Sequence, residues 1–130
     1  MLRFTLAFCL FAQISAAETV LSPQQFEAFS QGKTLYFSQA GQPYGAEQYL
    51  PNRQSIWQYA DGSCHRGIWF TRKDQICFIY ENNPEEQCWN FLDKDGVYAA
   101  RAIGNPPEAD LVVSLQDTAP LICLGPEIGA

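Results

Sequence analysis

Four cysteines are the residues whose type and spacing point most directly to chemistry in this sequence. They are Cys64, Cys77, Cys88 and Cys123, and an even set in a small exported domain predicts two disulfides. Of the three possible pairings we expect Cys77–Cys88 with Cys64–Cys123. A hairpin turn at 82–84 places position 77 opposite position 88, where facing Cβ atoms lie about 4.5–5.5 Å apart. Zinc is the alternative, but the intervening 12 and 10 residues match no paired zinc knuckle.

The sequence does not indicate catalytic chemistry. His65 is the only histidine, and a serine or cysteine hydrolase needs its histidine beside a nucleophile and an orienting group. There is no G-x-S-x-G elbow, no phosphate-binding loop and no dinucleotide fingerprint. We therefore predict no catalytic residues, no metal and no cofactor, and expect that the protein is not an enzyme. An enzyme that uses Asp or Glu together with His65 is the least favoured hypothesis.

Aromatic side chains are unusually frequent, with 9 Phe, 6 Tyr and 3 Trp among 130 residues. Most are expected in the core, because strands favour aromatic residues and small β domains fill their interiors with them. Tyrosines near the first turns are expected to be exposed: Tyr36, Tyr44, Tyr49 and Tyr59. The residues predicted to line a binding face or barrel mouth are Tyr44, Tyr49, Trp57, Tyr59, His65 and Trp69.

The elements that must position these residues are one helix followed by a series of strands. Ser22-Pro23-Gln24-Gln25 forms a capping-box pattern and Gly32 ends the segment, so a short helix is predicted over 23–31. Short β-rich segments then alternate with turns rich in Gly, Pro, Asn and Asp. The expected strands are 34–38, 46–50, 55–59, 64–71, 75–81, 87–92, 97–103 and 111–115, with a less clearly marked one at 121–124.

Short connections between consecutive strands favour antiparallel neighbours. The predicted fold is therefore mainly β: an antiparallel up-and-down meander that forms a small lipocalin-like barrel or half-barrel, with one short N-terminal helix. A single disulfide-bonded β domain is expected over 18–130. The strand at 75–81 is apolar on both faces, so we expect the helix, the tail or a partner to cover the second face.

The first 17 residues have the character of a cleavable signal peptide. Arg3 supplies a positive charge, an apolar run extends to Ile14, and the small residues Ser15-Ala16-Ala17 suit cleavage after Ala17. The run is shorter than the roughly 20 residues that span a bilayer, so an amino-terminal membrane anchor is the less favoured alternative. We expect removal of 1–17, no membrane span in the mature chain, and a periplasmic or secreted location.

The predicted mature chain is acidic. Loss of Arg3, the one charged residue of the leader, changes the net charge from −6 to −7. Nucleic-acid binding depends on Lys and Arg side chains that neutralise phosphates, so we expect no nucleic-acid partner. Anionic membrane surfaces are a poor match for the same reason.

A block of short motifs runs through the middle of the chain: Gly67-Ile68-Trp69, Ile76-Cys77-Phe78-Ile79-Tyr80-Glu81 and Gln87-Cys88-Trp89. The motifs before it are Gly32-Lys33-Thr34-Leu35, Pro43-Tyr44-Gly45, Glu47-Gln48-Tyr49, and Trp57 with Asp61-Gly62-Ser63-Cys64. With these motifs the chain resembles a group of small exported bacterial proteins of unknown function, over nearly all residues after the leader. The resemblance implies an exported, disulfide-bonded β domain and carries no activity, ligand or site residues.

These observations favour a non-enzymatic binding module of the cell envelope or secreted space. Its partner is expected to be a small molecule or an envelope protein, and we expect a monomer. The alternative is an inhibitor or protein-interaction domain that presents a rigid loop to an envelope enzyme, since rigidity lowers the ordering cost of binding. An interior cavity lined by aromatic residues favours the first hypothesis, whereas a long exposed loop without a cavity favours the second.

Overall fold

Turn residues divide the chain into the strands of a meander. The computed structural model describes residues 9–12 and 17–125. Over these ranges the chain forms one α-helix, α1 (Pro23–Ser30), and one 3₁₀ turn, η1 (Pro107–Ala109). Its strands are β1 (Glu18–Val20), β2 (Thr34–Gln39), β3 (Gln42–Leu50), β4 (Gln54–Tyr59), β5 (Cys64–Arg72), β6 (Gln75–Tyr80), β7 (Asn83–Lys94), β8 (Val97–Ala102) and β9 (Leu111–Asp117).

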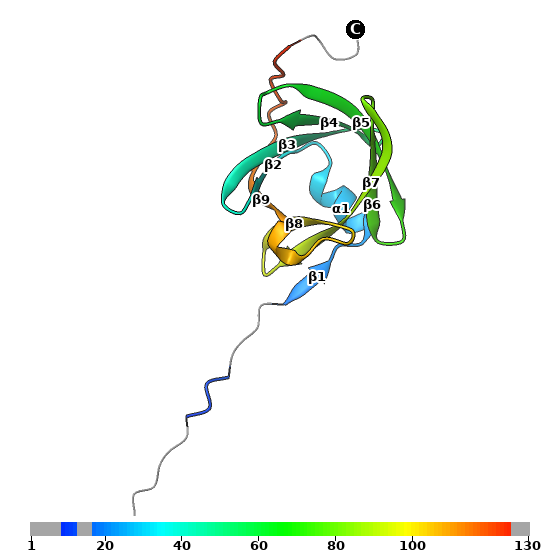
Figure 1. Ribbon diagram of the computed structural model, residues 1–130. Coiled ribbons are helices and arrows are strands. Elements are labelled where there is room, and N and C mark those ends of the chain that lie inside the picture. Colours follow the sequence, from blue (N-terminus) through cyan, green and yellow to red (C-terminus); the bar gives the residue numbers. More distant parts are fainter. Residues whose placement is uncertain (1–8, 13–16, 126–130) are drawn as a thin grey trace, which may run out of the picture.

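The strands β2 to β9 close into an antiparallel barrel (Figure 1). Each strand pairs with the next in sequence, and β9 also pairs with β2, where Val113 lies opposite Phe37. The short strand β1 adds to the side of β7, with Thr19 opposite Asp93. The predicted mainly β, up-and-down barrel with one short helix is confirmed, and the barrel is closed. Closure pairs the backbone groups that the edges of an open sheet would leave free.

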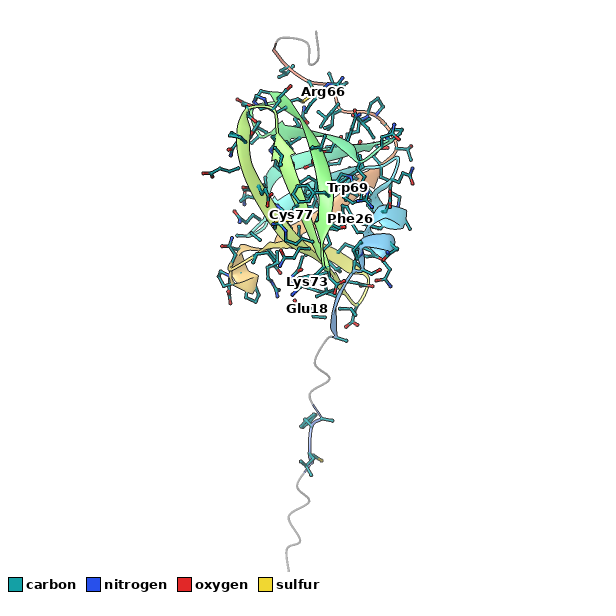
Figure 2. The ribbon with its side chains drawn as sticks, turned by 90° about the vertical axis from the view of Figure 1, so that its right-hand side faces the viewer. Glu18, Phe26, Arg66, Trp69, Lys73 and Cys77 are labelled. Atoms are coloured by element: carbon teal, nitrogen blue, oxygen red, sulfur yellow. A yellow bond between two sulfur atoms is a disulfide. The ribbon has the colours of Figure 1, made fainter. Side chains whose placement is uncertain are left out.

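Helix α1 forms where the capping box predicted it and covers one end of the barrel. The Ser22 hydroxyl accepts from the Gln25 backbone N–H over 3.1 Å, and the Gln25 side chain accepts from the Ser22 N–H over 2.8 Å. Phe26 is fully buried, and its ring centroid lies 5.1 Å from that of Trp69 on β5. Figure 1 shows α1 inside the ring of strands, and in Figure 2 the labelled residues Phe26 and Trp69 lie next to each other. The helix therefore supplies an apolar plug.

Both predicted disulfides are confirmed. Cys77 and Cys88 face each other on β6 and β7, with Cα atoms 4.0 Å apart, and form what we call the hairpin disulfide. Cys64, at the start of β5, is bonded to Cys123 near the carboxyl end with Cα atoms 5.6 Å apart, and this pair is the tail disulfide. Two disulfides in a small domain indicate an oxidising, extracytoplasmic environment.

The segment 118–125 crosses the outside of β2, β3 and β4. One side chain from each strand, Thr34, Gln48 and Gln58 in turn, is hydrogen bonded to the backbone of this segment over 2.7–3.0 Å. The tail disulfide then attaches it to β5. The tail is therefore a structural part of the barrel wall.

The main differences from the prediction are two strand starts, one strand that was not predicted and one predicted strand that does not form. β3 begins at Gln42 instead of residue 46 and β7 at Asn83 instead of residue 87, because turn residues continue the pairing across register shifts. The sequence does not predict β1, whose three residues carry no strand pattern. The strand predicted at 121–124 is wrong: among the described residues it makes a single bridge, from Leu124 to Ser63.

The expectation that β6 is covered on both faces is met only in part. Its inner face lies in the barrel core, where Ile76 and Phe78 are almost fully buried. The outer face is open around Ile79, since Ile68 opposite it on β5 is 54 % exposed. The tail crosses β2 to β4 and does not provide the second cover.

Most of the predicted leader, 1–8 and 13–16, lies outside the described residues. Cys9 is an exposed free cysteine, outside both disulfides. Within the part of the chain that the structure describes, no helix has the length and apolar character that crossing a bilayer requires.

Candidate functional site

The barrel encloses a cavity of about 150 Å³, here called the barrel cavity. Helix α1 closes one end, where the ring centroids of Phe26 and Tyr49 lie 5.5 Å apart. Toward the other end of β3 is the mouth, where Tyr44 and Tyr59 are 43 % and 39 % exposed. Nine of the lining residues are aromatic, and the full lining is Phe37, Tyr44, Glu47, Tyr49, Trp57, Tyr59, Phe78, Tyr80, Gln87, Trp89, Phe91, Ala100 and Leu111.

Glu47 is the one charged residue in this lining, and it is only 3 % exposed. The Tyr80 hydroxyl donates to its carboxyl group, 2.9 and 2.8 Å from the two oxygens. Tyr80 lies on β6 and Glu47 on β3, so the tyrosine reaches across two strands. The register places Gly67 opposite Tyr80 and Ser55 opposite Gly67. These two small residues leave the inner surface of β4 and β5 open to the long side chain.

Two glycines seat aromatic rings against the inner wall. A Cβ atom at Gly67 would lie 2.7 Å from the Tyr80 ring, and one at Gly45 would lie 2.4 Å from the Trp57 ring. Real Cβ atoms do not approach that closely. The absence of a side chain at both positions therefore fixes where two rings of the cavity lie.

Burial raises the pKa of Glu47 from 4.5 to about 7. The hydroxyls of Ser55 and Tyr80 oppose the rise, although only the Tyr80 hydroxyl meets hydrogen-bond geometry. Burial, and then the charge of Glu47, raise the pKa values of Tyr49 and Tyr80 well above 10. The charge of the Glu47 carboxyl group therefore changes near neutral pH, whereas the buried phenols of Tyr49 and Tyr80 stay neutral there.

Four of the six predicted binding residues line the barrel cavity together: Tyr44, Tyr49, Trp57 and Tyr59. Tyr49 is 2 % exposed, so the expectation that it is exposed is wrong: it lies on the inner face of β3 against Phe26. Trp69 is outside the lining and packs in the core at the helix end, with the Arg53 guanidinium 4.7 Å from its ring.

His65 also lies outside the cavity lining, near the mouth. Its ring centroid is 5.5 Å from that of Tyr59, and its Nδ1 is 3.6 Å from a carboxylate oxygen of Glu81. Among the described residues no serine, threonine or cysteine side chain is hydrogen bonded to it. The pair has the histidine and acid of a hydrolase without a nucleophile beside them.

The predicted set lacked three polar residues of the cavity lining, Glu47, Tyr80 and Gln87. Alternation placed Tyr80 on one face with Ile76 and Phe78, and that face is the inner one. The same period of two places Glu47 with Tyr49. The missing information was which face of each strand turns inward.

No three His, Cys, Asp or Glu side chains converge as a metal site within the described ranges. Comparisons with models of protein families, with curated proteins and with solved structures find no match to this chain. The resemblance to small exported bacterial proteins therefore stays a prediction, and function must be argued from the barrel cavity.

Proposed function

We propose that this protein is an exported, non-enzymatic binding module that holds a small, largely apolar molecule inside its barrel. The observation that carries the proposal is the barrel cavity, enclosed by eight strands, closed at one end by α1 and lined mainly by aromatic rings. Binding sites for small molecules are typically concave and apolar, with a few polar groups that orient the ligand. Glu47, Tyr80 and Gln87 are such groups here.

The volume limits the ligand to a small one. A cavity of about 150 Å³ lined by apolar residues admits a molecule the size of benzene, and the barrel cavity has about that volume. A single ring or a compact branched group fits this space, whereas long acyl chains need more. The half-exposed Tyr44 and Tyr59 offer a route of entry at the mouth.

The alternative, an inhibitor that presents a rigid loop, has less support. The connections from β2 through β8 are two to four residues long, and the longest link between the barrel strands β2 to β9 is 103–110, between β8 and β9. That link contains η1 and Asp110, which is held by ion pairs. The chain thus has an interior cavity and lacks, within its described barrel, a long free loop.

The location is proposed from two features. The disulfides indicate an oxidising compartment, and the leader over 1–17 predicts export through a cleaved signal peptide. We propose the periplasm or the secreted space. Sequencing the amino terminus of protein recovered from its host tests this: a mature chain that begins at Glu18 supports export, and an intact leader contradicts it.

Fluorescence tests the binding function, because Trp57 and Trp89 line the cavity. Benzene-sized aromatic and branched alicyclic compounds are titrated into the folded, oxidised protein. We expect saturable quenching or blue shift in the wild type and loss of both in Ala100→Leu, which adds bulk to a lining residue that is 3 % exposed.

Ala119→Leu is the matched control, since it makes the same change on the exposed surface of the tail. Circular dichroism and thermal unfolding establish that both variants are folded. Equal binding by Ala100→Leu and the wild type would place the ligand outside the barrel, and an absence of any saturable change in the wild type would contradict the proposal.

A further inference from the structure

The two buried carboxyl groups of the barrel have opposite surroundings. Asp110, 4 % exposed, accepts from Lys94 Nζ at 2.6 Å and from Arg101 Nε at 2.7 Å. Glu47, 3 % exposed, has no basic side chain as a partner among the described residues, and its donor is the neutral Tyr80 hydroxyl. Buried charges are usually paired, because an unpaired one is costly. Glu47 differs from Asp110 in facing the barrel cavity.

The rest of the lining is suited to a positive charge. Aromatic faces attract cations through the ring quadrupole, Trp most strongly, and cages of such rings bind quaternary ammonium groups. Trp57 lies directly opposite Glu47 in the register of β3 and β4, and the Trp57 and Tyr44 ring centroids are 6.0 Å apart. No lysine, arginine or histidine is in the lining. A carboxylate ligand would be repelled by Glu47 and would find no basic partner there.

We propose that the barrel cavity binds an organic ammonium ion, with its positive charge against the Glu47 carboxylate and its alkyl groups against the surrounding aromatic faces. This inference rests on the proposed function, because it names the class of ligand for the same cavity. The protein's net charge of −6 also favours the approach of a cation over that of an anion.

The charge on Glu47 makes this binding depend on pH. Directly opposite Glu47, β2 and β4 present Leu35 and Trp57, which do not ionise. Among the described residues the other ionisable side chains of the cavity are all tyrosines, and Tyr49 and Tyr80 are the buried ones. Both phenols stay neutral because their pKa values are raised. A quaternary ammonium keeps its charge at all pH values. Its affinity should therefore rise as the pH passes through about 7, where Glu47 ionises.

A matched pair of probes separates charge from shape: choline and its neutral carbon isostere, 3,3-dimethylbutan-1-ol. Both are titrated by calorimetry into the oxidised wild-type protein at pH 8 and pH 5.5. We expect choline to bind at least about tenfold more tightly than the isostere at pH 8, since desolvated cation–π contacts alone supply that ratio. The ratio should shrink at pH 5.5, whereas the affinity of the isostere should stay constant.

Glu47→Gln keeps the size of the side chain and removes the charge. It should abolish the pH dependence of choline binding and reduce the preference for choline to the part that the aromatic faces supply. Glu108→Gln is the matched control. Glu108 is exposed on η1, so this substitution removes the same charge at a position away from the cavity. It should retain both effects. If Glu47→Gln does not fold, the titrations of the wild type at pH 8 and pH 5.5 are sufficient to test whether choline binding depends on a carboxylate.

The outcomes distinguish this inference from the proposed function. Equal or tighter binding of the isostere, or binding of neutral rings with no binding of choline, overturns the ammonium assignment and leaves a binding barrel. A choline preference at pH 8 that is undiminished in Glu47→Gln overturns the role of the carboxylate. Absence of binding by every charged and neutral probe overturns both the assignment and the proposed function.

Discussion

The carboxyl group of Glu47 should make the ligand-free protein less stable as the pH rises from 5 to 8. Its pKa is about 7 in the folded protein and 4.5 as an unburied side chain. Between these values the folded state holds a proton that the unfolded state has released, so raising the pH favours unfolding. The difference of about 2.5 pH units corresponds to roughly 3 kcal/mol, fully lost above pH 7.

Glu47→Gln isolates this effect. The amide has the shape of the protonated acid and still accepts from Tyr80, so the variant and the wild type should have similar free energies of unfolding at pH 5. At pH 8 the variant should be more stable by up to about 3 kcal/mol. Urea unfolding at pH 5, 6, 7 and 8, followed by tryptophan fluorescence with the disulfides intact, measures both curves.

Other carboxyl groups act outside this pH range. The pKa values of Asp61, Glu86 and Asp110 are lowered by their hydrogen-bond partners, so the stability they contribute is lost only under more acidic conditions. Glu108→Gln should follow the wild-type curve at every pH. A wild-type protein equally stable at pH 5 and 8, or a decline that persists unchanged in Glu47→Gln, would refute the reasoning.

Three further predictions concern the contacts of Tyr80 and the two disulfides. Tyr80→Phe should lower the free energy of unfolding at pH 8 by about 1.5–3 kcal/mol, because a buried carboxylate loses its donor, and urea unfolding beside Glu47→Gln measures this. Gly67→Ala should displace the Tyr80 ring from its 2.7 Å approach and should move its aromatic NMR resonances; unmoved resonances would contradict the packing argument. Replacing both cysteines of the tail disulfide by alanine should cost about 4 kcal/mol, against about 3 for the hairpin disulfide, since the loops span 59 and 11 residues; the opposite order in chemical unfolding would contradict the loop-entropy account.

Much of the fold was predictable because local chemistry determines it. The capping box at Ser22 fixed the start of α1, and turn residues separated the strands. The position of one turn gave the facing pair Cys77 and Cys88. The ends of β3 and β7 were less predictable because register shifts at 37–38 and 78–80 let turn residues rejoin the ladder. Such bulges depend on how neighbouring strands twist, which a single strand's pattern does not encode.

The cavity was harder to predict than the strands that form it. Period-two alternation sorts the residues of β6 into two faces, but the open outer face and the closed inner face are both apolar. Tyr80 and Glu47 are 33 residues apart, and their contact depends on barrel closure and on small residues at Gly67 and Ser55 between them. No local pattern links four residues on four strands.

The surroundings of Glu47 argue that its carboxyl group serves a ligand instead of the barrel itself. A carboxylate that stabilises the fold is placed as Asp110 is, between Lys94 and Arg101. Glu47 is instead expected to lower stability by up to about 3 kcal/mol above neutral pH, a loss that an amide of the same size would avoid. On the proposed assignment a bound ammonium ion offsets that loss. Choline should therefore raise the melting temperature of the protein more at pH 8 than at pH 5.5, and this difference between the two pH values should disappear in Glu47→Gln.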